Sequence, residues 1–478
     1  MEYEAVIGLE THVQLNTRTK MWCSCRNEYG ADPNTNVCPV CLGFPGALPV
    51  ANERAMELTA LTGLLLNCRI PERAQFDRKN YFYPDSAKNY QITQLALPST
   101  IEGYVEFELG GQMEKVRINR AHLEEDVGKS FHFDNESGVD FNRGGVPLLE
   151  IVTEPDIQSA DMAYEYLCAL KAILEYGGIS ECDMEKGMVR CDVNISVRPV
   201  GQQKLGEKVE IKNMNSFSGV RRALLYEIPR QIEAIQNGEK IIQETRRWDD
   251  VAGMTESMRT KEDAHDYRYF PCPDLMPFVV ESSWLEKVRS QVVELPLARK
   301  RRLIGEYGIS DGDADVFVSD VSLGDYFQGV VAASGTKNPK NVANWIVNTL
   351  KGAMTEHEMA IQDLRFTQDQ FIELLGLVES GKISRSAGLD VFGEMFGKGT
   401  PPQEVVEKKG LAQVSDTGAL EAFCDEAIAA NPKSVEDFRN GKPAALNFLK
   451  GQVMKLSRGK ANPAVVGELL EKKILESQ

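Results

Sequence analysis

The sequence has no hydrophobic run long enough to cross a lipid bilayer. Its longest apolar stretch, LTALTGLLLN at residues 58–67, falls well short of the roughly 20 apolar residues that a membrane helix needs. The N-terminal MEYEAVIGLE carries acidic residues where a secretory leader has basic ones. These absences predict a cytoplasmic protein with no membrane segment. In that compartment cysteines stay reduced, so clustered cysteines are expected to be metal ligands rather than disulfide partners.

Several signatures of nucleotide-binding and hydrolytic enzymes are also missing. No GxGxxG, HExxH or GxSxG occurs. VGKS at residues 127–130 resembles the end of a P-loop, but Leu123 stands where that loop needs its first glycine. A nucleotide must therefore bind in a site of another kind. The chain also contains no internal repeat and no low-complexity segment.

The 478 residues exceed what one hydrophobic core accommodates and predict two or three domains. Short β-like runs alternate with turns up to about residue 290, and helical periodicity dominates beyond Pro296. A second boundary is expected in the Gly- and Pro-rich stretch 397–410. We predict an α+β fold whose N-terminal domain, 1–293, is built on a mainly antiparallel sheet. An all-helical connector, 294–405, and a small helical tail, 406–478, follow.

A basic segment stands out because the net charge of the whole chain is −17. Residues 438–460 contain six basic side chains and no acidic one. Such a segment is either a solvated helix face or a surface that contacts the phosphates of a nucleic acid. Its basic residues are Arg439, Lys442, Lys450, Lys455, Arg458 and Lys460.

Four cysteines lie within nineteen residues. Cys23 and Cys25 form one close pair, and Cys38 and Cys41 form a second, twelve residues later. This spacing favours a tetrahedral zinc site over four unrelated reduced thiols. Because four thiolates complete the coordination sphere, the zinc is expected to be structural.

The strand predicted just before the cysteines has two different faces. Ile7, Leu9, Val13 and Leu15 alternate with polar residues in EAVIGLETHVQL. The polar face brings Glu10 and His12 to within about 7 Å of each other. Such a face is either solvent-exposed surface or part of a functional site.

Two further predicted strands carry carboxylates in step with apolar residues. Glu125 is in step with Ala121 and Leu123, and Glu150 is in step with Leu148 and Val152. Burying a carboxylate is costly unless it is paired or binds a cation. Together with the first strand, the two glutamates can converge on Mg²⁺, which favours oxygen ligands.

Polar and aromatic side chains on other strands suit a nucleotide or an RNA end, although the aromatic residues can also belong to the core. They lie in DRKNYFYPDSAKNYQI, MVRCDVNISVR and KVEIKNMNSF. The candidate nucleotide- or substrate-binding residues are Lys79, Tyr81, Tyr83, Lys88, Arg190, Asp192, Asn194, Lys212 and Asn213.

Taken in order, ten motifs resemble the B subunit family of aspartyl/glutamyl-tRNA amidotransferases, over essentially the whole chain. They include IGLETHVQL, KNYFYPD, HLEEDVGKS, GGVPLLEIVTEPD, RCDVNIS, KNMNSF, DYRYFP and GQVMKLSRGKANP. The resemblance implies a cradle-like N-terminal domain and a tail that binds tRNA. It also implies that ATP phosphorylates the side-chain carboxylate of Glu-tRNA(Gln) or Asp-tRNA(Asn), and that ammonia then displaces the phosphate.

The resemblance further implies particular ligands and partners. Magnesium is expected at His12, Glu125 and Glu150, with Glu10 as an additional catalytic carboxylate. Zinc is expected to be a brace, because only some family members keep the four cysteines. The sequence has no serine-rich amidase signature, so ammonia is expected from an amidase-type A subunit, with a small C subunit completing the assembly. The tRNA-binding residues are expected to be Lys450, Lys455, Arg458 and Lys460.

Two other interpretations remain open on sequence grounds. A non-catalytic zinc-containing RNA-binding protein explains the cysteines and the basic segment, but not strands that carry carboxylates, which repel RNA. A free-standing metal-dependent ligase or hydrolase explains the carboxylates.

Overall fold

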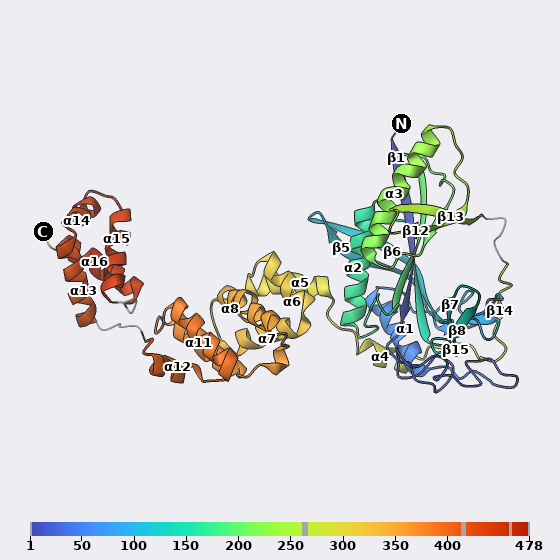
Figure 1. Cartoon of the computed structure of the whole chain (residues 1–478), viewed down its shortest axis with the longest axis horizontal. Helices are drawn as coiled ribbons and strands as arrows, with labels where there is room; N and C mark the ends of the chain where they lie inside the picture. The colour runs from blue at the N-terminus through green and yellow to red at the C-terminus, as the bar shows by residue number, and fades with distance from the viewer. Residues whose placement is uncertain (1, 261–265, 413–416, 458–460, 477–478) are drawn as a thin grey trace. The chain divides into compact units, whose positions relative to one another are not determined.

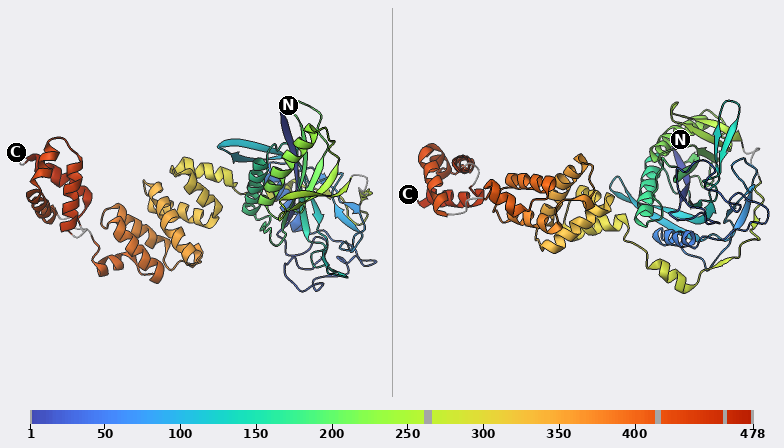
Figure 2. Two further views of the ribbon diagram at one scale, coloured as in Figure 1. Left: turned by 45° about the horizontal axis from the view of Figure 1, so that its top comes forward. Right: turned by 60° about the horizontal axis from the view of Figure 1, so that its bottom comes forward.

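The computed structural model describes residues 2–260, 266–412, 417–457 and 461–476. The chain separates into two compact units, Met1–Ala298 and Arg299–Gln478, whose elements are drawn in Figures 1 and 2. Among the described helices, none is both long enough and apolar enough to span a membrane.

The first unit is organised around a large twisted sheet. Within the described residues this sheet has eight strands in the order β13-β12-β11-β10-β1-β9-β6-β5. Neighbouring strands are antiparallel except β11 and β12, which run parallel. The strands are β1 (Tyr3–Gln14), β5 (Thr100–Leu109), β6 (Gln112–Glu125), β9 (Pro147–Thr153), β10 (Val189–Pro199), β11 (Val209–Lys212), β12 (Glu244–Asp249) and β13 (Met254–Thr260).

Three helices cover one face of this sheet. They are α1 (Glu53–Leu65), α2 (Ala160–Tyr176) and α3 (Phe217–Gln236), and they pack on β5, β6, β10 and β13 in Figure 1. Each begins at a side-chain cap, in which Asn52, Ser159 or Ser216 accepts a hydrogen bond from a backbone N–H of the first turn.

The apolar side of each central strand faces these helices. Ile7, Leu9 and Val13 of β1 share one core with Leu167 of α2 and Leu224 of α3. The alternate residues of β1, including Glu10 and His12, lie on the opposite face. That opposite face is the polar face of the sheet, and it carries the candidate site.

Smaller strands and the cysteine segment complete the first unit. Among the described residues, β14 (Phe270–Pro271), β3 (Asp77–Asn80) and β4 (Tyr90–Thr93) form a three-stranded sheet, and β4 packs against β6. Two short pairs join β15 (Phe278–Val279) to β2 (Arg73–Ala74), and β7 (Lys129–His132) to β8 (Ser137–Asp140). Helix α4 (Ser282–Arg289) packs on α1.

The second unit is helical. Its described α-helices are α5 (Pro296–Tyr307), α6 (Asp311–Ser319), α7 (Val321–Ser334), α8 (Pro339–Trp345), α9 (Lys351–Glu356), α10 (Gln368–Glu379), α11 (Arg385–Lys398), α12 (Pro402–Lys409), α13 (Thr417–Ala430), α14 (Pro432–Arg439), α15 (Ala444–Leu456) and α16 (Pro463–Glu476). A π-helical stretch, η2 (Ile346–Leu350), joins α8 to α9, and a 3₁₀ turn, η3 (Ile361–Asp363), precedes α10.

Two hydrophobic cores serve these helices. One contains buried residues from Leu303 to Val406, and the other contains buried residues from Leu420 to Ile474. The boundary expected after residue 405 lies within α12, whose Val405 and Val406 both belong to the first core.

The predicted fold class is confirmed: a mainly antiparallel sheet region comes first and helices follow. The division into segments 1–293, 294–405 and 406–478 stays a prediction.

Candidate functional site

Strand register places the ionisable groups of the polar face in rows. His12 of β1 lies opposite Glu150 of β9, and Glu150 lies opposite His122 of β6. Glu124 stands two residues after His122 on β6 and therefore shares its face. Four groups from three neighbouring strands are thus gathered at one place.

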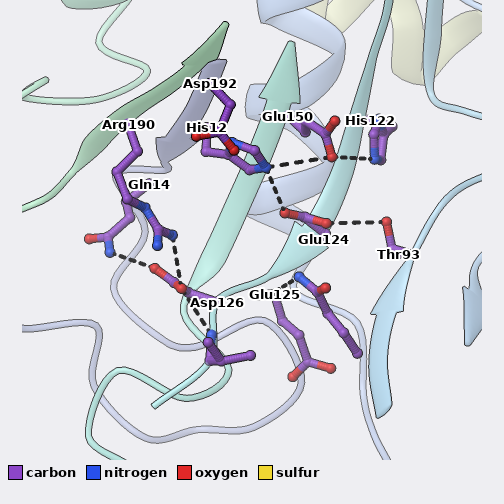
Figure 3. Close-up of polar contacts among 12 residues, drawn as sticks. His12, Gln14, Thr93, His122, Glu124, Glu125, Asp126, Glu150, Arg190 and Asp192 are labelled. Atoms are coloured by element: carbon purple, nitrogen blue, oxygen red, sulfur yellow. Dashed lines mark hydrogen bonds and ion pairs between the residues drawn. The ribbon is translucent and has the colours of Figure 1, made fainter. Parts of the chain in front are cut away.

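These groups form a compact cluster, shown in Figure 3. His12 Nε2 lies 3.7 Å from Glu124 Oε1 and 3.6 Å from Glu150 Oε2. His122 Nε2 lies 3.2 Å from the same Glu150 oxygen. The Thr93 hydroxyl donates to Glu124 over 3.3 Å. One ligand atom from each of His12, Glu124 and Glu150 lies within 4.8 Å of the others, so the three can hold one cation.

Burial and mutual attraction set the protonation of the cluster. Burial raises the pKa of Glu124, although His12, His122 and Lys79 oppose it. Burial also acts on Glu150, but hydrogen bonds from the two histidines prevail and lower its pKa. For His12, burial disfavours the charged form, yet Glu150 and Glu124 outweigh burial and raise its pKa. A cation held by His12, Glu124 and Glu150 would take over from the imidazolium proton as the balancing charge.

Glu125 does not join this cluster, and the expected trio is corrected to His12, Glu124 and Glu150. The Glu125 carboxylate points to the other side of β6 (Figure 3) and accepts a hydrogen bond of 2.9 Å from the Ile92 N–H. It also pairs with the Lys88 ammonium. The physical reason is the two-residue period of a strand, which sends adjacent side chains to opposite faces.

A second acidic group lies beside the first on the same face. Glu10, Asp192 and Glu210 each place a carboxylate oxygen within 4.8 Å of the others. The Lys212 ammonium lies 2.6 Å from Asp192 and 3.1 Å from Glu210. Burial opposes the charge of Lys212, but the two carboxylates outweigh burial and raise its pKa. Asn194 donates to Glu10 over 2.8 Å. The structure thus brings the predicted binding residues Asp192, Asn194 and Lys212 together with Glu10.

Arg190 borders the cluster formed by His12, His122, Glu124 and Glu150, and a buried carboxylate holds its side chain there. Asp126 accepts hydrogen bonds of 3.0 Å from Arg190 Nη2 and 3.0 Å from Gln14 Nε2. Burial raises the pKa of Asp126, but Arg190 and Arg143 overcome it and lower the pKa. The remaining N–H groups of Arg190 are available to an anion on the polar face.

Lys79 supplies another cation close to the cluster. Burial disfavours its charge, but Glu124 leads a set of anionic neighbours that raises its pKa. Its ammonium lies 4.9 Å from the centre of the Tyr267 ring, which also packs edge-on against Tyr81. Tyr83 is 58% exposed, so it is not a core residue.

Two predicted binding residues lie away from the cluster. Lys88 points to Glu125, on the far side of β6. Asn213 has a left-handed backbone, with φ of 69°, and donates to the Trp248 carbonyl over 3.2 Å. Their binding roles stay predictions.

The four clustered cysteines converge as their spacing predicts. One sulfur atom from each of Cys23, Cys25, Cys38 and Cys41 lies within 4.8 Å of the others. The sulfurs of Cys38 and Cys41 are 3.8 Å apart. Tetrahedral Zn–S bonds of about 2.3 Å require about this separation, so the donor set fits zinc.

The cysteine segment is fastened to the loop before β9. The buried Lys20 ammonium donates to the Asn36 carbonyl over 2.9 Å and lies 3.8 Å from Cys41 Sγ. The Met21 N–H donates to the Gly145 carbonyl over 2.7 Å. A hydrogen bond with Cys23 lowers the pKa of Cys41 to about 4, and Lys20 adds to the effect. The thiolate form of Cys41 is therefore favoured, whereas the hydrogen bond with Cys41 raises the pKa of Cys23 and burial raises the pKa of Cys25.

Of the four predicted tRNA-binding residues, Lys450 and Lys455 lie on α15, and Lys455 is exposed. Arg458 and Lys460 lie outside the described residues. Two other members of the basic segment make contacts within the protein: Arg439 donates to the Ile474 carbonyl and Lys442 pairs with Asp437.

Sequence reasoning missed Glu124, His122 and Asp126. A usable signal was present in HLEED, where His122 and Glu124 alternate with the apolar Ala121 and Leu123. Choosing the carboxylate in step with the apolar residues selected Glu125 instead, whose side chain lies on the other side of β6 and pairs with Lys88. A cation that meets a phosphate must lie on the open face.

Two adjoining carboxylate clusters flanked by Lys and Arg, on the face of the sheet opposite its three helices, are typical of an enzyme that handles phosphate groups. Residues 5–286 match the family described as the GatB/GatE catalytic domain, and residues 325–474 match the family described as the GatB domain. The chain belongs to the GatB family.

Relatives are similar over their whole length, and the following three are each named as the B subunit of the aspartyl/glutamyl-tRNA(Asn/Gln) amidotransferase. The protein of Carboxydothermus hydrogenoformans is 51% identical over 478 residues, covering 99% of both chains. That of Methylacidiphilum infernorum is 50% identical over 489 residues, covering 100% of both. That of Thermodesulfovibrio yellowstonii is 50% identical over 477 residues, again covering 100% of both.

Proposed function

We propose that this chain is the kinase and amide-forming subunit of a glutamine-dependent tRNA amidotransferase. It takes Glu-tRNA(Gln), Asp-tRNA(Asn) or both, phosphorylates the side-chain carboxylate with ATP, and joins ammonia to the activated carbonyl. The supporting observation is the pair of carboxylate clusters on the polar face, with Lys79, Arg190 and Lys212 beside them. The family match gives no support to a non-catalytic zinc-containing RNA-binding protein.

The chemistry explains why such a face is needed. A carboxylate at neutral pH does not accept ammonia. Its oxygen first attacks the γ-phosphorus of ATP, and ADP leaves. Ammonia then attacks the carbonyl carbon of the acyl phosphate, inorganic phosphate leaves, and an amide remains. Phosphoryl transfer depends mainly on positioning and on neutralising charge.

The residues of the polar face divide these tasks. His12, Glu124 and Glu150 would hold one magnesium ion, and Glu10, Asp192 and Glu210 could hold a second cation. Magnesium, when bound, neutralises phosphate charge and aligns the transferred group. Arg190, fixed by Asp126, and Lys79 orient phosphate oxygens from two sides of the His12 cluster.

The cysteines have a separate task. Four thiolates leave no coordination position for a substrate, so the zinc braces the segment between β1 and α1. Through Lys20 and Met21 this brace reaches the loop that enters β9, the strand that carries Glu150.

Among the described residues, the polar face of the sheet has no group that releases ammonia from glutamine, so partner subunits are needed. Ammonia comes from an amidase-type A subunit, and a small C subunit completes a heterotrimer. The helical tail, residues 406–478, binds the misacylated tRNA. Because that substrate belongs to translation, we place the protein in the cytoplasm.

The test is ATP hydrolysis that depends on misacylated tRNA, measured on the assembled amidotransferase. Glu124→Gln is expected to abolish both this hydrolysis and amide formation, whereas hydrolysis of glutamine to glutamate, which occurs on the partner, persists. Full amide formation by Glu124→Gln would refute the proposal.

A further inference from the structure

Arg120 is a cation on the polar face to which the proposed chemistry assigns no task. It lies on β6, two residues before His122 and four before Glu124, and it shares their face. Arg120 stands opposite Val152 of β9, and Val152 in turn stands opposite Glu10 of β1. Arg120 therefore belongs to a row of residues that crosses the polar face beside both carboxylate clusters.

A β-bulge turns the Arg120 side chain to this face. The pairing of β6 with β9 shifts between Ile118 and Arg120, so that Asn119 is an extra residue. Ile118 before the bulge and Ala121 after it are both buried in the core. In an unbroken strand these two residues would point to opposite sides, and Arg120 would share the core side with Ile118. Bulges are frequent next to active sites, where they re-aim a side chain.

The guanidinium of Arg120 has a buried donor without a partner. Its Nε atom is buried and makes no hydrogen bond to any of the described residues. Its Nη1 atom donates to Asn119 Oδ1 over 3.4 Å, which is long for a hydrogen bond of this kind. A buried donor that stays unpaired costs free energy. An acceptor on a bound ligand would remove that cost.

The charge of Arg120 is also not balanced within the protein. In the part of the chain that the structure describes, no carboxylate forms an ion pair with Arg120. Other cations of the polar face differ, since Arg190 lies 3.0 Å from Asp126 and Lys212 lies 2.6 Å from Asp192. A guanidinium holds a carboxylate through two parallel N–H···O bonds. Arg120 thus suits an anion that the substrate brings.

The misacylated amino acid brings such an anion. Its carboxylate must approach the γ-phosphate of ATP, and the two negative charges repel each other. The proposed cations and Arg190 already serve the phosphates, so the attacking carboxylate needs a cation of its own. Strand order provides one on the far side, because β1 and β9 separate β10, which carries Arg190, from β6, which carries Arg120.

We infer that Arg120 binds the side-chain carboxylate of the glutamyl or aspartyl group on tRNA. This inference rests on the proposed kinase function and adds to it a residue that recognises the substrate. Arg120 makes no covalent bond, and it positions the oxygen that attacks the γ-phosphorus. It also separates substrate from product. The amide formed by the reaction is uncharged, and its NH₂ group meets the N–H donors of the guanidinium without being able to accept from them.

Binding measured in the absence of ATP tests the inference on the assembled amidotransferase. The wild type is expected to bind Glu-tRNA(Gln) at least about tenfold more tightly than the product Gln-tRNA(Gln). Arg120→Gln is expected to weaken binding of Glu-tRNA(Gln) at least about tenfold and binding of Gln-tRNA(Gln) less than about twofold. A tenfold change corresponds to about 1.4 kcal/mol. Asp-tRNA(Asn) and Asn-tRNA(Asn) form the equivalent pair.

Two further variants control for charge and for folding. Arg120→Lys retains a positive charge but not the paired donors, so its preference for substrate over product is expected to lie between wild type and Arg120→Gln. It also keeps the test decisive if Arg120→Gln is unstable. Arg117→Gln is the matched control, because Arg117 lies on the same strand and is already paired with Asp156 over 2.7 Å. Both of its affinities are expected to match those of the wild type.

Three results would overturn the inference while leaving the kinase function intact. One is an unchanged preference for Glu-tRNA(Gln) over Gln-tRNA(Gln) in Arg120→Gln and Arg120→Lys. Another is an equal loss of affinity for both tRNAs, which assigns Arg120 a structural role. The third is a raised KM for ATP with an unchanged preference, which assigns Arg120 to the phosphates. Unimpaired amide formation by Glu124→Gln, in contrast, would remove the kinase function on which the inference rests.

Discussion

Glu124 and Glu125 are neighbours in the chain, yet their carboxylates serve opposite sides of the sheet. Glu124 Oε1 lies 3.7 Å from the His12 imidazole, whereas Glu125 accepts a hydrogen bond from the Ile92 N–H and pairs with Lys88. Both side chains are almost fully buried, at 3% and 4% exposure. The pair therefore separates the proposed cation-binding role of Glu124 from a structural ion pair of Glu125 within one dipeptide.

Paired substitutions are expected to divide these roles. Glu124→Gln should lower tRNA-dependent ATP hydrolysis at least about 100-fold, because a preorganised charge at the phosphate is lost, and Glu150→Ala should do the same. Glu125→Gln should cost about 3–5 kcal/mol of stability, because it leaves the Lys88 charge buried without its partner. Magnesium affinity, measured by titrating ATP hydrolysis, should fall for Glu124→Gln and stay close to wild type for Glu125→Gln.

One zinc ion per chain is expected in protein purified without chelator. Cys38→Ser should reduce the zinc content and lower the free energy of unfolding by about 3–5 kcal/mol, because a structural metal is lost. Atomic absorption and thermal unfolding give the two readouts, and Cys424→Ser, at a cysteine in the core of the last helices, controls for loss of a thiol. Wild-type protein without zinc would refute the site.

Removal of the last helices is expected to weaken tRNA binding without unfolding the rest. The cut belongs after Leu411, because Val406 and Leu411 still pack in the core of the preceding helices. In the full chain, Lys455→Ala should raise the KM for tRNA and flatten its salt dependence by nearly one unit of log–log slope for each phosphate that is no longer neutralised. The turnover number at saturating tRNA should hardly change. Equal affinity and equal salt slope in the truncated protein would assign these helices a purely structural role.

The helical unit contains an ion pair network that responds to acid. Lys398 and Lys409 lower the pKa of Glu394 to about 2. A carboxylate with a depressed pKa stabilises the fold above its ordinary pKa and loses that contribution as the pH falls through the folded-state value. The difference in thermal midpoint between wild type and Glu394→Gln should therefore be present at pH 7 and shrink between about pH 4.5 and pH 2. Glu404→Gln, at an exposed position of α12, should show no such trend.

Local sequence determined much of this protein. The alternation in EAVIGLETHVQL fixed the two faces of β1, and with them the placement of Glu10 and His12 on the polar face. The cysteine spacing brought four sulfurs together because the ligands lie close in the chain. The order of the motifs fixed the family, and the change from short runs to helical periodicity fixed the α+β class.

Other features required the tertiary structure. His12, Glu150 and His122 meet because the strand order β1-β9-β6 and its register place them opposite one another, and neither order nor register can be read from any single strand. The choice of Glu124 over Glu125 depended on which face the helices α1, α2 and α3 cover. Arg120 reaches the polar face because of the bulge at Asn119, which is defined only by the pairing of β6 with β9. Short-range sequence patterns indicate which face of its own strand a residue lies on. A site built from several strands depends on how those strands pack together.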